Sequence, residues 1–342
     1  MRRRGDAHSA RSVNLSSKGS DVKVADGIHR IDTPLGERVN SLYLIRGDDG
    51  AVLFDTGVDG TAQQHLQPYL EENGIDPETI RWVFVSHADV DHFGGLSSMR
   101  ELLPHAVYGC HRDDAALIES YEVFETRRAR NFREPWGLDE DPEVLAWTRE
   151  VTRESPVDVQ VVGGERLRLS KDREVEIVHA PGHSRGHLSL WDSATRSLIV
   201  SDAVLADSVR LADGSPAFPP TYRFVDEYVS TVARFEAMAP ELLLTAHYPT
   251  MRGDEALSFL ATSRNFAEAL ERTMQDVVEA TGDQGIALRP LLEALNPRIG
   301  TWPQDGTIGA LAFPVVGHLE RALATGRMEL IDGDPTRVRA SR

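Results

Sequence analysis

The sequence predicts a mixed α/β protein, and three observations support this class. Short apolar runs typical of strands occur in two blocks, and helical patterns alternate with them. A charged segment of helical pattern, at about residues 112–155, separates the blocks. The chain becomes mainly helical after about residue 254. Alternation of strands and helices is typical of sheets covered by helices.

The first block begins near residue 22. Its expected strands are at 27–31, 41–45, 51–55 and 82–85. A Gly-Asp-Asp-Gly turn at 47–50 joins the second and third of these into a hairpin. A helical pattern at about 61–73 precedes the fourth.

The second block follows the charged segment, with expected strands at 157–161, 166–169, 175–178, 188–191 and 198–200 and another at 241–244. Aromatic residues are scattered through the segment at 112–155. Their side chains either form an apolar wall of a site or only pack against neighbouring elements.

We expect three parts along the chain: a flexible tail at 1–21, a catalytic domain at 22–253, and a helical extension at 254–342. The extension has helices through Phe259–Met274, 288–295 and 316–324 and ends in a hairpin, which suggests a winged-helix shape. Such shapes often bind DNA, but this one has nine Arg, no Lys and thirteen acidic residues. The charge favours packing or homodimerisation instead.

The composition excludes several classes. A net charge of −17 repels phosphate backbones and anionic lipids, so we expect a small-molecule substrate and neither nucleic acid nor membrane as partner. Cys110 is the only cysteine, which rules out an intrachain disulfide and fits the cytoplasm. The start of the chain lacks the apolar stretch of a signal peptide, and no run reaches the ~20 apolar residues of a membrane span. Neither a serine-hydrolase elbow nor a phosphate-binding Gly loop is present.

Potential metal ligands crowd the loop after the strand at 82–85: His87, Asp89, Asp91 and His92. Imidazole and carboxylate bind zinc, iron and manganese, and a tight loop can aim several of them at one point. A solvated acidic turn is the alternative, since Asp and His are common in turns.

Further candidate ligands also follow strands. Asp55, Asp202 and His247 come directly after apolar strands, and the turn Pro181-Gly182 would project His183. Side chains delivered from one end of several strands converge at one rim. The sequence therefore predicts a single metal centre.

This ordered set, from Asp55 through the loop at 87–92 to His183, Asp202 and His247, resembles the metallo-β-lactamase-fold superfamily, with its glyoxalase II-like and lactonase-like members. The resemblance spans about residues 22–250. It implies a four-layer αβ/βα sandwich with one or two metal ions at the edge of the two sheets.

By position, the resemblance assigns one metal site to His87, Asp89 and His183. The other site receives Asp91, His92 and His247, and Asp202 bridges the two. It also implies that Asp55 orients a ligand and that Asp91 relays a proton. Metal-bound water would supply hydroxide near neutral pH.

Asp89 is a departure, because the superfamily usually has His at this position. A harder ligand set shifts the preference from zinc toward iron or manganese, and diiron members of the superfamily use Glu here. Alternatively the Asp89 carboxylate does not contact a metal ion and the first site stays empty. One ion bound by Asp91, His92, Asp202 and His247 would then support the reaction, as in some hydrolytic dehalogenases that this arrangement resembles.

Other residues receive more modest roles. We expect His179 and His187 to hold neighbouring backbone through hydrogen bonds, and His111 lies where it approaches the pocket mouth. Tyr222 and Arg223 lie where substrate contacts are expected, with solvent exposure as the alternative for Arg223. His8, His29, His65, His105 and His318 follow no recurring pattern.

The first hypothesis is a metallohydrolase, with zinc as the expected metal, acting on an ester, lactone, thioester or activated aryl compound. A mononuclear zinc dehalogenase-like enzyme is a variant of it. The second is a diiron redox protein, motivated by Asp89, although no flavodoxin-like module follows residue 254. The third is a non-catalytic metal-binding protein.

Overall fold

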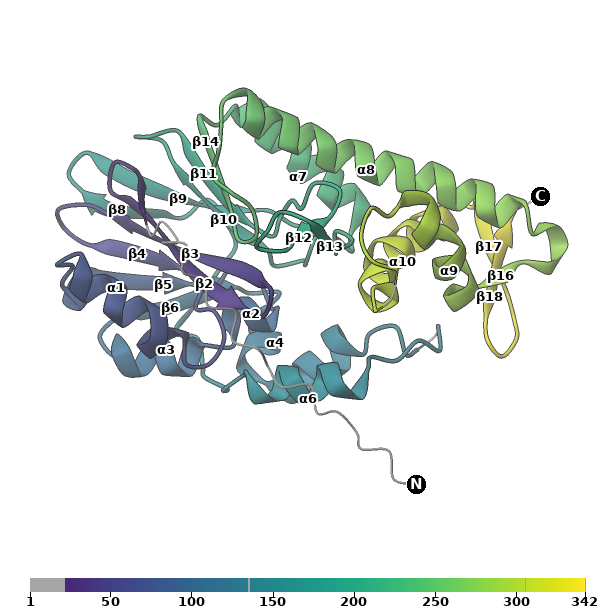
Figure 1. Ribbon diagram of the computed structural model, residues 1–342, viewed down its shortest axis with the longest axis horizontal. Coiled ribbons are helices and arrows are strands. Elements are labelled where there is room, and N and C mark those ends of the chain that lie inside the picture. The colour runs from purple at the N-terminus through teal and green to yellow at the C-terminus, as the bar shows by residue number, and fades with distance from the viewer. Residues whose placement is uncertain (1–21, 135, 305, 342) are drawn as a thin grey trace, which may run out of the picture.

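Two β-sheets pack face to face in this computed structural model, which describes residues 22–134, 136–304 and 306–341 (Figure 1). The first sheet has the strand order β1 (Val22–Ala25), β2 (Ile28–Leu35), β3 (Arg38–Arg46), β4 (Ala51–Phe54), β5 (Ile80–Phe84), β6 (Val107–His111), β7 (Val159–Val161). The second has the order β15 (Met251–Arg252), β14 (Leu242–Thr245), β11 (Ser197–Ser201), β10 (Leu188–Asp192), β9 (Arg173–His179), β8 (Arg166–Ser170). Apolar side chains from both sheets fill the space between them.

Strand direction decides where the loops lie. In the first sheet β4, β5, β6 and β7 run parallel, and in the second sheet β11 and β14 run parallel. The carboxyl ends of parallel strands meet at one edge of a sheet. The loops after β4 and β5, and those after β11 and β14, therefore form two groups of neighbours.

Helices cover the outer face of the first sheet. The helices of this part of the chain are η1 (Ala62–Leu66), α1 (Gln67–Glu72), η2 (Pro77–Thr79), α2 (Val90–Phe93), α3 (Leu96–Leu102), α4 (Ala115–Glu119), α5 (Tyr121–Phe124), η3 (Glu125–Ala129) and α6 (Pro142–Glu150). Those that bury apolar side chains against this face are η1, α1, α2, α3, α4 and α5. Tyr69, Phe93, Met99 and Leu103 are buried against that face.

The outer face of the second sheet is covered by α7 (Val225–Met238) and by the first part of α8 (Asp254–Glu279). In Figure 1, α8 continues past the sheets to the C-terminal helices and the small terminal sheet. These later elements are η4 (Gly282–Gln284), β16 (Ile286–Ala287), α9 (Leu288–Ile299), α10 (Ile308–Ala324), β17 (Met328–Ile331) and β18 (Arg337–Ala340). A short hairpin of β12 (Val209–Arg210) and β13 (Pro216–Phe218) precedes α7.

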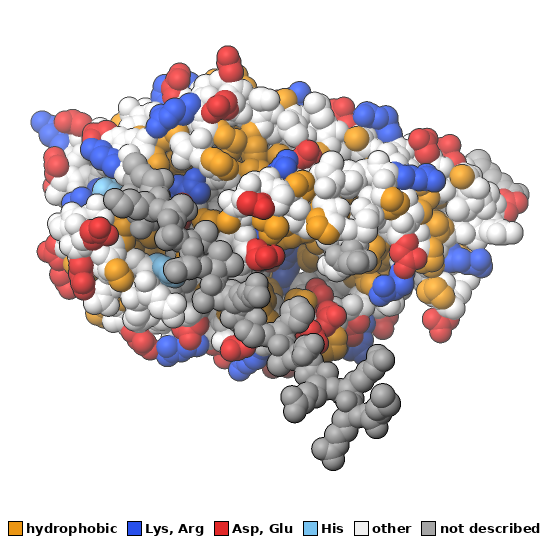
Figure 2. All heavy atoms as spheres, in the orientation of Figure 1, with side chains coloured by type: hydrophobic (Ala, Val, Ile, Leu, Met, Phe, Trp, Pro, Cys, Tyr) orange, Lys and Arg blue, Asp and Glu red, His pale blue; other side chains and the backbone are white. Residues whose placement is uncertain are grey.

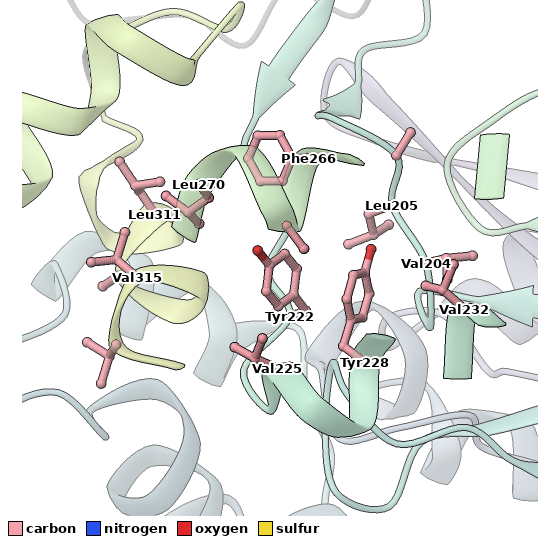
Figure 3. Close-up of a cluster of buried hydrophobic side chains, with 14 of the residues drawn as sticks. Val204, Leu205, Tyr222, Val225, Tyr228, Val232, Phe266, Leu270, Leu311 and Val315 are labelled. Atoms are coloured by element: carbon pink, nitrogen blue, oxygen red, sulfur yellow. The ribbon is translucent and has the colours of Figure 1, made fainter. Parts of the chain in front are cut away.

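The C-terminal helices share a hydrophobic core with the second sheet. Figure 3 shows Leu311 and Val315 of α10 near Leu270 of α8, with Tyr222 and Tyr228 beside them. The two tyrosine rings stack with centroids 4.2 Å apart. Because this core is continuous across residue 254, burial of apolar area ties the extension to the sandwich.

The predicted fold class is confirmed, including both strand blocks, the hairpin of β3 and β4, and the helices and hairpin after residue 254. Several elements were not foreseen, among them α3, β6, the hairpin of β12 and β13, α7, and β16, which makes the terminal sheet three-stranded. The expected flexible tail at 1–21 lies outside the described residues.

The surface carries both signs of charge, and Figure 2 shows them interspersed over the visible face. Within the described parts of the chain, no helix is both long enough and apolar enough to cross a lipid bilayer.

His318 is a buried titratable group in the shared core. Its Nε2 lies 2.9 Å from the Tyr222 hydroxyl, and burial lowers the pKa of His318 to about 4, although Glu271 opposes the shift. As the pH falls below the unfolded-state pKa of roughly 6.5, only the unfolded chain gains this proton. The folded state therefore loses stability between about pH 6.5 and pH 4.

Between pH 6.5 and 4.5, the free energy of unfolding is expected to fall by about 2–3 kcal/mol less in His318→Phe than in the wild type. Urea unfolding at the two pH values measures it. Tyr222→Phe is the matched control, since it removes the hydrogen bond but leaves the imidazole buried, and it should keep the wild-type pH dependence. Equal pH dependence in His318→Phe and wild type would contradict the assignment.

Candidate metal centre

The loop after β5 places its side chains through backbone geometry. Asp89 has extended dihedral angles, φ −110° and ψ 142°, at the N-cap of α2, and Asp91 and His92 lie on this short helix. Both the amide and the hydroxyl of Thr56 donate to the His92 carbonyl, at 2.9 and 2.8 Å. These hydrogen bonds from the loop after β4 therefore fix the position of the loop after β5.

Asp55 sets the orientation of His92. Asp55 Oδ2 lies 2.9 Å from His92 Nδ1 and accepts from Ser201 Oγ at 2.8 Å, while Oδ1 accepts from the Ser86 amide at 2.7 Å. An ionised carboxylate accepts hydrogen bonds, so Nδ1 carries the proton. His92 Nε2 is left facing Asp91 Oδ1 at 3.8 Å and Asp202 Oδ2 at 3.7 Å.

Asp202 and His247 reach the same place from the second sheet. His247 Nδ1 lies 2.8 Å from the Val39 carbonyl, which accepts its proton and leaves Nε2 as a free donor atom for a metal. His247 Nε2 is 3.3 Å from Asp202 Oδ2 and 3.8 Å from Asp91 Oδ2. Side chains from both sheets therefore meet at one point.

His183 lies on a turn that requires glycine. Gly182 has φ 145°, and a Cβ there would lie 2.6 Å from Tyr228 Cα. The Gly182 carbonyl accepts from the amides of Arg223 and Phe224, which anchors the turn at the start of α7. His183 is held with its ring centroid 4.5 Å from that of His87.

The residues expected at the site converge as the spacing predicted. Three groups have ligand atoms within 4.8 Å of one another: His87, Asp89 and His183; Asp91, His92 and His247; and His87, His92 and Asp202. His87 Nε2, His92 Nε2 and Asp202 Oδ1 are buried with no hydrogen-bond partner among the described residues. Buried polar atoms normally have partners, so orphaned nitrogen and oxygen donors facing one point fit a divalent metal.

The electrostatics match such a site. Burial opposes the shift, but Asp55, Asp91 and Asp202 raise the pKa of His92 well above its usual value. Burial also opposes the shift at Asp202, whose pKa His247 and His92 hold well below the usual value. At His87, burial lowers the pKa to about 4. Asp202 is therefore ionised and His87 is neutral at pH 7, the forms that bind metals, and an ion that binds at His92 must displace the proton from its Nε2.

Asp89 makes a contact that sequence reasoning missed. Arg128 of η3 forms a two-pronged ion pair with it, from Nε to Oδ1 at 2.7 Å and from Nη2 to Oδ2 at 2.8 Å. Asp89 Oδ2 also lies 2.9 Å from His183 Nε2 and 3.4 Å from His87 Nε2. Although burial opposes the shift, the Arg128 guanidinium holds the pKa of Asp89 well below its usual range.

Asp114 is a second buried residue that the sequence did not reveal. Its carboxylate accepts from Ser184 Oγ at 2.6 Å, the Gly186 amide at 3.0 Å and the Ala88 amide at 3.2 Å. These hydrogen bonds therefore link the turn of His183 to the loop of His87. No strand or glycine turn marks Asp114 in the sequence, where it reads as part of an acidic surface helix.

The remaining candidates have structural contacts. His179 Nε2 lies 2.8 Å from the Arg185 carbonyl, as expected, but neither His187 ring nitrogen has a partner among the described residues, and the ring stacks on His87. His111 stacks on His179 and accepts from the Asp113 amide. Tyr222 is buried against His318, and Arg223 pairs with Glu320.

Comparison with known proteins supports the same assignment. A family profile described as the metallo-beta-lactamase superfamily matches residues 35–247. The acyl-coenzyme A thioesterase MBLAC2 of Homo sapiens is 28% identical over 262 residues, which cover 70% of this chain and 84% of that protein. A probable metallo-hydrolase, YflN of Bacillus subtilis, is 24% identical over 72% of this chain and 93% of its own length.

Solved structures match both the sandwich and the extension. A beta-lactamase domain protein from Burkholderia ambifaria superposes with a TM-score of 0.73 at 18% identity, covering 96% of each chain. The metallo-beta-lactamase family protein TTHA1429 from Thermus thermophilus superposes with a TM-score of 0.70 at 17% identity, covering 92% of this chain and 99% of that one. With the family profile and the convergent ligand set, these matches show that the chain is a hydrolase that belongs to the metallo-β-lactamase superfamily.

Proposed function

We propose that this protein is a zinc-dependent hydrolase of carboxylic thioesters. The observation that carries the proposal is the convergence of Asp91, His92, Asp202 and His247 from two sheets, where buried His92 Nε2 and Asp202 Oδ1 lack hydrogen-bond partners among the described residues. Nitrogen and carboxylate donors in this mixture suit zinc. The thioesterase similarity, over 70% of the chain, directs the choice of substrate among esters, lactones and thioesters.

The chemistry follows from the donor set. A metal ion held by these four residues would polarise the acyl carbonyl and lower the pKa of water. Asp91 keeps a side chain that is 14% exposed, at 3.8 Å from both His92 Nε2 and His247 Nε2. It is placed to take one proton from the water that adds to the acyl carbon and to give it to the departing sulfur. The carbon–sulfur bond breaks, and the products are a carboxylic acid and a thiol.

A substrate panel tests the proposal. Acyl N-acetylcysteamine thioesters, oxygen esters of the same acyl groups, a lactone and a chlorinated aryl nitrile should be compared at equal concentration. We expect kcat/KM to be highest for the thioesters. Dialysis against a strong chelator should reduce hydrolysis to the uncatalysed background rate, and addition of zinc should restore it. Thiol release is followed with a disulfide reagent.

Two outcomes would overturn it. Turnover that survives complete metal removal would exclude the metal-dependent mechanism. Metal-dependent turnover of the aryl halide or the lactone with none of the thioesters would keep the metallohydrolase and replace the substrate class.

A further inference from the structure

Arg128 brings a positive charge to the place where a first metal ion would bind. Its side chain is only 9% exposed, and it holds both oxygens of Asp89. Nη2 also lies 3.2 Å from His183 Nε2. Asp89 and His183, with His87, are the residues of one of the three potential metal groups. The guanidinium therefore lies against the same donor atoms that a first ion would need.

The fork geometry makes this contact strong. A guanidinium that bonds both oxygens of a carboxylate is a charge-assisted, bidentate pair, and arginine stays charged at any working pH. A divalent ion on Asp89 Oδ2 would lie close to this cation in a buried site, where like charges repel strongly. Binding there requires that Arg128 first leave Asp89.

Aromatic packing opposes that departure. The Arg128 Cζ atom lies 4.3 Å from the ring centroid of Phe313, on α10. Phe132 packs against the same ring, edge to face, with centroids 4.8 Å apart. A cation over an aromatic face gains about 0.5–2 kcal/mol, more when it is buried. The C-terminal extension therefore helps to fix the guanidinium over the site.

The charge balance points the same way. Asp89, Asp91 and Asp202 together carry three negative charges, and Arg128 with one divalent ion carries three positive charges. A second divalent ion would add two further positive charges directly beside the Arg128 guanidinium in a buried site, which is costly. The Asp91, His92 and His247 group, with Asp202 beside it, has no such arginine pair among the described residues.

We propose that Arg128 takes the place of the first metal ion, so that the protein binds one divalent ion, at Asp91, His92, Asp202 and His247. This inference rests on the proposed metal-dependent function and deepens it, because it assigns a fixed guanidinium to the second cationic position. Nη1 has no acceptor among the described residues and remains available to donate to a substrate oxygen. The pairing also assigns Asp89 to Arg128, which removes the feature that suggested a diiron centre.

Metal stoichiometry tests this without reference to turnover. Protein equilibrated with excess zinc and then dialysed should retain one zinc per chain by elemental analysis. Arg128→Ala frees Asp89, His87 and His183 and should retain two. Arg127→Ala is the matched control, since Arg127 is the exposed neighbour on η3, and it should retain one. Two zinc ions in the wild type, or one in a folded Arg128→Ala protein, would overturn the proposal.

A second measurement covers the case in which Arg128→Ala does not fold. Titration of the metal-free wild type with cobalt, followed by visible absorbance, should reach its end point at one equivalent, and Asp89→Asn should not change that end point. An end point at two equivalents, reduced to one by Asp89→Asn, would show that Asp89 binds a metal and that Arg128 does not replace it. Two bound ions together with metal-dependent turnover would contradict only this inference. A protein that binds no ion and whose turnover is independent of metal would contradict the proposed function.

Discussion

Replacing His92 by alanine is expected to lower kcat/KM for a thioester by about 1,000-fold or more. A metal ion contributes several kcal/mol to transition-state stabilisation, and each 1.36 kcal/mol corresponds to a factor of ten. His92 is buried at the centre of the site and lies close to both Asp91 and Asp202. Its loss should also reduce bound zinc below 0.1 equivalent, about a tenfold depletion.

Steady-state kinetics and elemental analysis measure the two effects, and circular dichroism shows whether the fold is intact. His105→Ala is the matched control, because His105 precedes β6, at the end of the first sheet opposite the site, and contacts the Ile80 carbonyl. It should keep wild-type kinetics. Full turnover by a folded His92→Ala protein would remove His92 from the metal site.

Replacing Asp55 by asparagine is expected to weaken metal binding by about 10–100-fold, the usual effect of losing a group that orients a ligand. Asparagine tolerates the left-handed conformation of residue 55, whose φ is 69°, so the backbone should stay in place. The amide oxygen can still accept from the Ser86 amide, but the amide nitrogen cannot accept from His92 Nδ1. The His92 ring would therefore lose the partner that fixes its protonated nitrogen.

Competition with a chromophoric chelator gives the zinc dissociation constant, and turnover at saturating zinc should recover to within about tenfold of wild type. Asp172→Asn, an exposed substitution in the turn between β8 and β9, controls for the loss of charge and should leave the constant unchanged. An unchanged constant in Asp55→Asn would show that Asp55 is structural only.

The sequence revealed the seven candidate ligands because each follows an apolar strand or a glycine turn, features that local pattern makes visible. Parallel pairing of β4 with β5, and of β11 with β14, then brings them together, as α/β topology leads one to expect. The loop of His87 to His92 was the most informative segment because it combines strand, turn and ligand chemistry.

Arg128 and Asp114 could not be found in this way. Both lie in the charged segment at 112–155, where a charged residue on a helix ordinarily faces water, and only tertiary packing turns these two inward. Helix α7 was also missed, although its buried residues Val225, Tyr228, Val232 and Phe235 recur at helical spacing. Arg128 and Asp114, which contact the candidate ligand loops, are thus residues whose role depends on distant segments.

The candidate metal ligands come from both sheets of the sandwich, Asp91 and His92 after β5 and Asp202 and His247 after β11 and β14. An ion bound there bridges the two halves of the molecule and has no equivalent site in the unfolded chain. At a free concentration of about 100 times its dissociation constant, such an ion adds about 2.7 kcal/mol to the folding free energy by mass action. Cells starved of the metal would therefore lose the enzyme itself to proteolysis, because a larger fraction of its molecules would be unfolded at any moment.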